Sequence, residues 1–141
     1  MITDVITAVS RTLDERFDGA YAVHTEKVEQ GLAPPCFIIT VVDAENTPLL
    51  RDRANRVYAL DVVYISKSNT NAEMYAMADK LFSALGLVTM TDGSRLLAYN
   101  MRYEEVDGDL HFFVTYQLTV RAPEDEDAME SYSLNSEIGG I

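Results

Sequence analysis

The chain has 141 residues, of which 48% are hydrophobic and 24% charged, a composition typical of a globular domain with its own core. It carries 23 Asp and Glu against 11 Lys and Arg, a net charge of −12 that argues against binding nucleic acid through a basic surface. The single cysteine excludes an internal disulfide bond, and we expect neither a secretion signal nor a membrane span.

Apolar residues recur at intervals of three and four in two segments, a spacing typical of amphipathic helices. The first helix is predicted over residues 2–17 and should end at Asp18 and Gly19, because glycine readily takes the left-handed conformation that closes a helix. The second should begin with the capping box Thr70 to Glu73 and end at Gly86. Each helix has one apolar face, so each should lie on another element.

Strands are predicted on both sides of the second helix. Residues 36–42 and 57–65 are rich in β-branched and aromatic side chains, and residues 97–104 and 112–121 alternate between apolar and polar. In the first of these alternating strands, one face is predicted to carry Leu97, Tyr99, Met101 and Tyr103. Asp107-Gly108 predicts a hairpin between the two alternating strands, and Asp92-Gly93 marks another turn. A short strand is possible around residues 21–27, and the polar residues 43–56 form either a long connection or an extended hairpin arm.

This order of elements predicts an α+β fold, a mainly antiparallel sheet with two helices packed on one face. Residues 1–121 are expected to form a single domain with 17 acids and 11 bases. Residues 122–141 hold six acids and no base, which predicts a mobile acidic tail that contributes half of the net charge.

The sequence shows no convergent set of catalytic residues. His24 and His111 lie far apart, without the Cys or carboxylate spacing of a zinc site, and are expected to be ordinary strand residues. Cys36 is expected to be a buried thiol, since no motif supports its alternative role as a nucleophile paired with histidine.

A carboxylate cluster flanks the predicted hairpin. It consists of Glu104, Glu105, Asp107 and Asp109. The cluster could bind a divalent cation, but it lacks the ligand spacing of a calcium loop and is expected to form a solvated turn. We therefore assign no catalytic, cofactor-binding or metal-binding residue, and favour a binding or assembly protein over an enzyme.

The strand at residues 57–65 is apolar on both faces, with Tyr58 and Tyr64 expected as exposed aromatic residues on one of them. Two helices can cover only one face of the sheet, so some apolar surface should need a partner. Either a ring or dimer interface covers this surface, or residues 43–56 fold back over it.

Two stretches resemble the signature segments of the phage tail terminator family, which occurs in tailed phages, prophages and phage-tail-like bacteriocins of Gram-positive bacteria. The first stretch is residues 28–32, VEQGL, followed by Pro35-Cys36-Phe37. The second is residues 106–114, VDGDLHFFV, with Tyr116 after it. The opening residues 1–6 also fit, and the resemblance covers nearly all of residues 1–121.

The resemblance implies a structural subunit that forms a ring, usually six-fold, at the head-proximal end of the tail tube. There it would stop tube polymerisation and join the tail to the neck. The implied partners are further copies of the chain, the tail tube protein, a neck or head-completion protein, and a sheath protein if the tail is contractile. DNA would be met only in transit, and the protein would reside in the virion tail after assembly in the host cytoplasm.

Two alternatives remain open. One is a neck connector or head-completion protein, and the other is a small metal-dependent hydrolase that uses the carboxylate cluster of Glu104, Glu105, Asp107 and Asp109.

Two segments, residues 43–56 and 122–141, are candidate contacts between subunits or with the tube. Arg51, Arg53 and Arg56 in residues 43–56 could pair with acids of a neighbouring subunit or could simply be solvated. The acidic tail offers Glu124, Asp125, Glu126 and Asp127 to a basic partner. If the domain lines a DNA channel, its net negative charge should let DNA pass without affinity.

Overall fold

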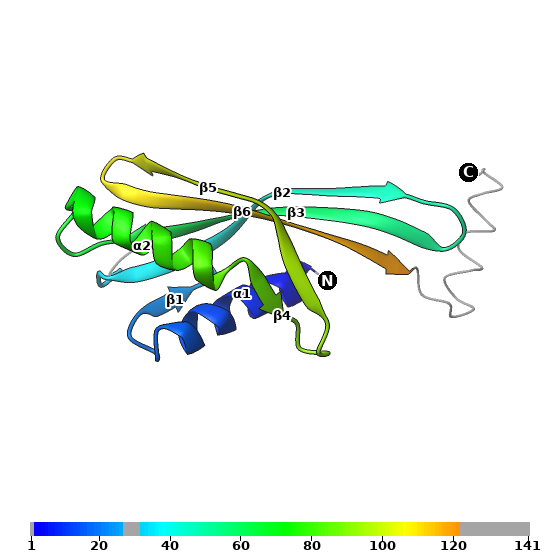
Figure 1. Cartoon of the computed structure of the whole chain (residues 1–141), viewed down its shortest axis with the longest axis horizontal. Coiled ribbons are helices and arrows are strands. Elements are labelled where there is room, and N and C mark those ends of the chain that lie inside the picture. The colour runs from blue at the N-terminus through cyan, green and yellow to red at the C-terminus, as the bar shows by residue number, and fades with distance from the viewer. Residues whose placement is uncertain (1, 27–31, 122–141) are drawn as a thin grey trace. The chain divides into compact units, whose positions relative to one another are not determined.

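The computed structural model describes residues 2–26 and 32–121. Two helices and six strands lie within these residues, in the order α1, β1, β2, β3, α2, β4, β5, β6 (Figure 1). Signature residues 28–31 and the acidic tail with Glu124, Asp125, Glu126 and Asp127 lie outside the described residues.

The chain divides into two compact units. The first unit comprises Met1–Glu45 and Val57–Gln117, and contains both helices and most of the sheet. The second comprises Asn46–Arg56 and Leu118–Ile141, of which the structure describes residues 46–56 and 118–121. No helix in the described parts of either unit is long and apolar enough to cross a membrane.

Helix α1, Ile2–Arg16, presents the apolar face that the sequence predicts, and buries Val5, Ala8, Val9 and Leu13. Asp18 and Gly19 follow it with φ angles of 54° and 69°. The Gly19 N–H donates to the Asp14 carbonyl over 2.8 Å. The predicted left-handed ending is therefore confirmed.

Helix α2, Asn71–Ala84, begins at Thr70, whose hydroxyl oxygen accepts a hydrogen bond from the Glu73 backbone N–H at 3.3 Å. Its last turn is closed by the Leu85 N–H, which donates to the Leu81 carbonyl. Gly86 is the first residue after this cap, as the sequence predicts, although it has no left-handed φ.

The strands form one six-stranded sheet in the order β1-β2-β3-β6-β5-β4. Their bounds are Ala22–His24 for β1, Cys36–Pro48 for β2, Arg53–Ile65 for β3, Leu87–Thr89 for β4, Arg95–Val106 for β5 and Asp109–Arg121 for β6. β1 runs parallel to β2, whereas β4 with β5 and β5 with β6 are antiparallel. The predicted α+β fold is confirmed, with α1 and α2 on one side of the sheet (Figure 1).

Of the two alternatives for residues 43–56, the structure has the hairpin arm, because β2 extends to Pro48 and β3 begins at Arg53.

The hairpin between β5 and β6 turns at Asp107 and Gly108, with φ angles of 54° and 84°, as the sequence predicts. A β-bulge then shifts the register between Ala98 and Asn100. The prediction that Leu97, Tyr99, Met101 and Tyr103 share one face is therefore wrong.

On either side of the bulge, the odd-numbered residues of β5 point to opposite faces of the sheet. Leu97 and Tyr99 are both 71% exposed, whereas Leu96 is buried. Beyond the bulge, Met101 lies against Gly86, and the Tyr103 ring lies 6.4 Å from that of Tyr75 on α2. Met101 and Tyr103 therefore point to the helix side of the sheet.

The core lies between the sheet and the helices. Every second residue along two adjacent strands is buried, namely Tyr58, Leu60, Val62 and Tyr64 on β3 and Leu110, Phe112, Val114 and Tyr116 on β6. The expectation that Tyr58 and Tyr64 are exposed aromatic residues is wrong, since they are only 2% and 1% exposed. The physical reason is that their face is the one the helices cover, and the Tyr64 ring packs 5.2 Å from that of Phe37.

Candidate interaction surfaces

The face of the sheet opposite the helices is half-buried along its centre. Here we call it the open face and define it by Val57, Ala59, Asp61, Val63 and Ile65 of β3 and His111, Phe113 and Thr115 of β6. All of these residues are intermediate in exposure, and the two rows alternate with the buried core rows of the same strands. The open face is therefore mainly apolar, with one acid and one histidine within it.

Asp61 and His111 form a pair at the centre of the open face. The His111 Nδ1 atom lies 2.8 Å from Asp61 Oδ2, and the two side chains are 24% and 14% exposed. The second carboxylate oxygen, Asp61 Oδ1, is buried and has no hydrogen-bond partner within residues 2–26 and 32–121. A carboxylate with one unsatisfied buried oxygen is costly to a folded chain.

A cation and an aromatic ring continue this row of side chains. The Arg102 guanidinium lies 4.3 Å from the centre of the Phe113 ring, and 3.4 Å from the Glu104 carboxylate. The His111 ring stacks on the Phe113 ring, and the two ring centres lie 6.2 Å apart. Aromatic and arginine side chains together are the types enriched where proteins contact one another.

The prediction that His111 is a strand residue is confirmed, and the alternation of β6 places it on the face opposite Phe112. Sequence reasoning missed that Asp61, 50 residues away, is its partner. The available signal was the position of Asp61, a single acid within an otherwise apolar face of the strand.

The carboxylate cluster at the hairpin does not converge. Glu104 stands opposite His111 and Glu105 opposite Leu110, so the two side chains belong to opposite faces of β5. Asp107 lies in the turn itself. Within residues 2–26 and 32–121, no group of three or more His, Cys, Asp or Glu is placed to hold a metal ion.

Glu73 links the start of α2 to the end of β3. Its carboxylate accepts hydrogen bonds from Tyr64 at 2.6 Å, from Ser66 at 3.1 Å and from Ser68. The bonds from Ser68 and Tyr64 lower the Glu73 pKa below its usual range. Burial, and next the hydrogen bond to Glu73, raise the pKa of the Tyr64 hydroxyl. The contacts identify Glu73 as a structural tie.

Cys36 is fully buried at the start of β2, as the sequence predicts. Burial is the main cause that raises the pKa of its thiol, and the charge of Asp109 adds to it. A raised pKa disfavours the reactive thiolate.

The tip of the β2–β3 arm is exposed and apolar. Leu49 and Leu50 are 44% and 82% exposed, and Arg51 takes a left-handed φ of 67° in the turn. Across the arm, the Arg56 guanidinium donates to Asn46 Oδ1 at 2.9 Å, while Asp52 lies 3.5 Å from Arg121. The structure thus places Arg51 and Arg53 at or beside the exposed tip and Arg56 on the shaft of the arm, with partial burial of Arg56.

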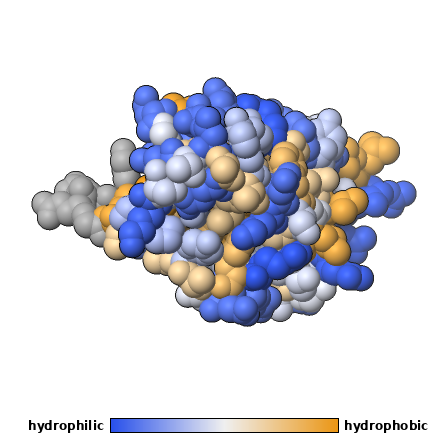
Figure 2. Space-filling view, turned by 60° about the vertical axis from the view of Figure 1, so that its left-hand side comes forward, coloured by the Kyte–Doolittle hydropathy of each residue, from blue (hydrophilic) through white to orange (hydrophobic). Residues whose placement is uncertain are grey.

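A second exposed apolar patch lies where β4 meets β5. Leu87 and Leu97 stand directly opposite each other in the register, and are 46% and 71% exposed. Figure 2 shows hydrophobic residues interspersed among hydrophilic ones on the face in view. Leu87 and Leu97, by contrast, are adjacent, and an exposed apolar group of this kind is a candidate protein contact site.

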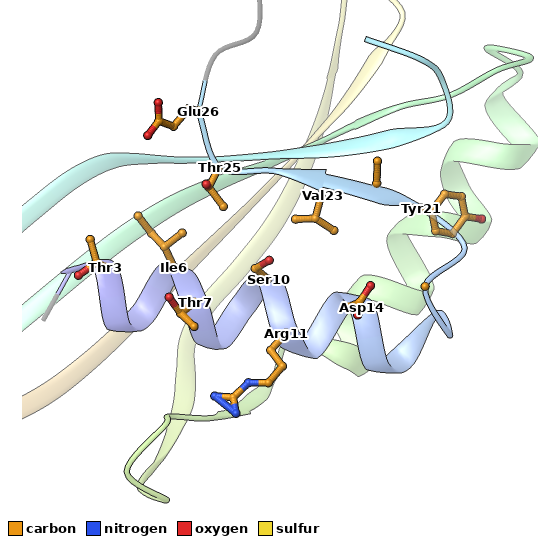
Figure 3. A pocket seen from close by; sticks show the side chains of 12 residues that line it. Thr3, Ile6, Thr7, Ser10, Arg11, Asp14, Tyr21, Val23, Thr25 and Glu26 are labelled. Carbon is orange, nitrogen blue, oxygen red and sulfur yellow. The ribbon is translucent and has the colours of Figure 1, made fainter.

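Hollows border helix α1 on two sides. One, of about 880 Å³, lies between α1 and β1, and its walls include Thr3, Ile6, Ser10, Val23 and Thr25 (Figure 3). Two smaller hollows, of about 270 and 350 Å³, share Arg16 and lie against α2 and β4. The larger one is open, and its lining mixes small polar and apolar side chains, without the convergent groups of a catalytic site.

The comparisons with known proteins agree with this picture. A chain in a structure described as the virion of the native gene transfer agent (GTA) particle is similar, with a TM-score of 0.54 and 16% identity over 82% of this chain and 93% of that one. At this identity the likeness shows the fold alone. No curated protein matches the sequence. The model of the phage tail terminator protein family matches residues 4–128. The chain therefore belongs to the phage tail terminator family, a family of structural proteins of the virion tail and not of enzymes.

Proposed function

We propose that the chain forms a ring, six-fold in the simplest case, that caps the head-proximal end of the tail tube, ends tube polymerisation and joins the tail to the neck. The observation that carries this proposal is the family membership over residues 4–128. The open face, the exposed arm tip and the β4–β5 patch support it, because a ring joins two different surfaces of each subunit. The partners would be other copies of the chain, the tube protein, a neck or head-completion protein and, in a contractile tail, sheath protein.

Arg51, Arg53 and Arg56 are proposed to contact a neighbouring subunit, together with the leucines at the arm tip. Leu49 and Leu50 offer apolar area that the described residues of the second unit leave exposed. Arginines beside such area can pair with acids across an interface and set which partner is accepted. DNA in transit would meet a domain with 17 acids and 11 bases in residues 1–121, and so pass without affinity.

Deletion of the protein from an assembling tail tests the function. Electron microscopy should then show tails of uncontrolled length that lack heads, and supplying the full chain should restore the normal length. Tails of normal length without the protein would contradict the proposal. A location at the portal side of the neck, away from the tube end, would favour the neck connector instead.

The contacts of the arm can be tested separately. The variant Arg51→Glu/Arg53→Glu should still fold, because both side chains are exposed, but should lose ring formation on the tube. Lys67→Glu is the matched control, since Lys67 is also exposed and lies in the loop before α2. Equal ring formation in both variants, measured by light scattering with tube protein present, would remove these arginines from the interface.

A further inference from the structure

The two smaller hollows beside α1 are lined by an unusual concentration of positive charge. One is lined by Arg16, Phe17, Lys80 and Ser83, and the other is lined by Arg11, Thr12, Glu15, Arg16, Ala84, Leu87 and Thr89. Because they share Arg16, we treat them as one basic groove, defined by Arg11, Arg16 and Lys80. The groove holds three of the 11 bases of the chain against one acid, Glu15, in a protein whose acids outnumber its bases by about two to one.

Neutral acceptors hold the two arginines in place. The Arg11 guanidinium donates to Thr91 Oγ1 at 3.3 Å, and that of Arg16 donates to the Ser83 carbonyl at 3.2 Å. Figure 3 shows the Arg11 side chain extending from α1 on the side away from β1. In the part of the chain that the structure describes, none of Arg11, Arg16 and Lys80 forms an ion pair. Their positive charge therefore remains available to an acidic ligand.

The groove also offers apolar surface. Leu87 lines it and is 46% exposed, and Phe17 lines its other hollow and is half-buried. A ligand that fits must therefore carry several carboxylates together with apolar side chains, which describes a peptide better than a small anion.

The chain itself contains one segment with this chemistry. Residues 122–141 hold six acids and no base, and among them stand Met129, Tyr132, Leu134 and Ile138. Twenty residues can span at most about 66 Å, at roughly 3.3 Å per residue, so the length of the tail does not confine its contacts to its own subunit. A head-to-tail ring requires two different and complementary surfaces on each copy.

We propose that the acidic tail of one subunit binds the basic groove of the neighbouring copy of the same chain. This inference rests on the proposed ring and names one of its contacts. Opposite charge brings the tail to the groove and selects it, and contact of the apolar side chains with Leu87 and Phe17 adds hydrophobic affinity. Each ring position then contributes one tail and one groove, so the contact repeats until the ring closes.

Disulfide trapping tests the contact and identifies which chain supplies the tail. Full-length Ser83→Cys and full-length Glu126→Cys are mixed, allowed to assemble with tube protein and oxidised. Cys36 is fully buried and should not compete. We expect a disulfide-linked dimer of the two variants, and none when Lys67→Cys, at an exposed site outside the groove, replaces Ser83→Cys.

Two results would overturn the proposal. The first is rings that assemble without any linked dimer, which would leave the ring function intact and remove this contact. The second is a link that forms only within one chain of the double variant Ser83→Cys/Glu126→Cys, because the tail would then bind its own groove. Absence of rings even in the unaltered chain would instead count against the proposed function.

Charge reversal gives an independent measurement. In the full chain, Arg11→Glu/Arg16→Glu/Lys80→Glu should weaken association of subunits on the tube by about tenfold or more at low salt. Changing Glu124, Asp125, Glu126 and Asp127 to Lys in the same chain should restore it. If the triple variant folds poorly, the single variant Lys80→Glu, at an exposed site of α2, takes its place. It should weaken association of the subunits by a smaller factor. Loss without restoration by the reversed tail, in variants with an unchanged circular dichroism spectrum, would overturn the proposal.

Discussion

The two faces of strands β3 and β6 differ, although the same backbone supplies both. On the helix side, each strand contributes four side chains that are at most 2% exposed. On the open face, the alternate residues are half-buried, and they include the Asp61–His111 pair and Phe113 under Arg102. Most of the buried apolar area of these two strands therefore lies on the helix side, and the open face keeps side chains that solvent can reach.

The adjacent phenylalanines of β6 give the sharpest test of this difference. Phe112 is fully buried, with its ring 5.0 Å from that of Phe82, so Phe112→Ala should lower the free energy of unfolding by about 3–5 kcal/mol. Phe113→Ala removes a half-buried ring and one cation–π contact, and should cost about 1–2 kcal/mol. Urea denaturation followed by circular dichroism measures both. Equal losses would show that the open face matters as much to folding as the core does.

The Asp61–His111 pair should behave as a coupled unit. His111→Ala removes the hydrogen-bond partner that the Asp61 side chain has among the described residues, and should cost about 1–3 kcal/mol. The double variant Asp61→Val/His111→Val, which fits the apolar neighbours of Asp61 on β3, should recover much of that loss. A double-mutant cycle by denaturation gives the coupling. If the double variant were less stable than His111→Ala, the buried pair would be a net source of stability.

Glu73 gives the smallest expected effect, and one on the helix side. Its pKa in the folded chain is lowered, so Glu73 stabilises the fold at pH values above about 4.3, its ordinary pKa, and this contribution is lost as the pH falls through the lowered value. The stability of the unaltered chain should therefore exceed that of Glu73→Gln most at neutral pH. The difference should narrow in acid, when denaturation midpoints are compared at several pH values. A difference that does not depend on pH would mean that the hydrogen bonds of Glu73 do not need its charge.

Features set by neighbouring residues could be predicted from the sequence. The left-handed residues after α1, the turn at Asp107 and Gly108, and the cap at Thr70 each depend on a few adjacent positions. The alternation of β6 identified one face as buried, because one face of the strand carries apolar residues at every second position.

Features set by distant residues could not be predicted. Burial of Tyr58 and Tyr64 depends on which face of β3 the helices cover, and both faces of that strand are apolar in sequence. The Asp61–His111 pair depends on β6 lying beside β3 in the sheet. The 43 residues between the end of β3 and the start of β6 form a helix and two other strands. The basic groove likewise brings together charged residues of α1 and α2 with Leu87 and Thr89 of β4, which are far apart in the sequence.

The bulge in β5 has a consequence for changes in chain length. Deleting the single residue Tyr99 would let β5 pair with β6 without a register shift, because Ala98 would still stand opposite Tyr116 and Asn100 opposite Thr115. Leu97 would then stay exposed, and Met101 would stay on the helix side. Loss of this one residue should therefore leave both sets of side chains on their present faces. The first end of β5 thus pairs with β4 and exposes Leu97, whereas the second end directs Met101 toward the core.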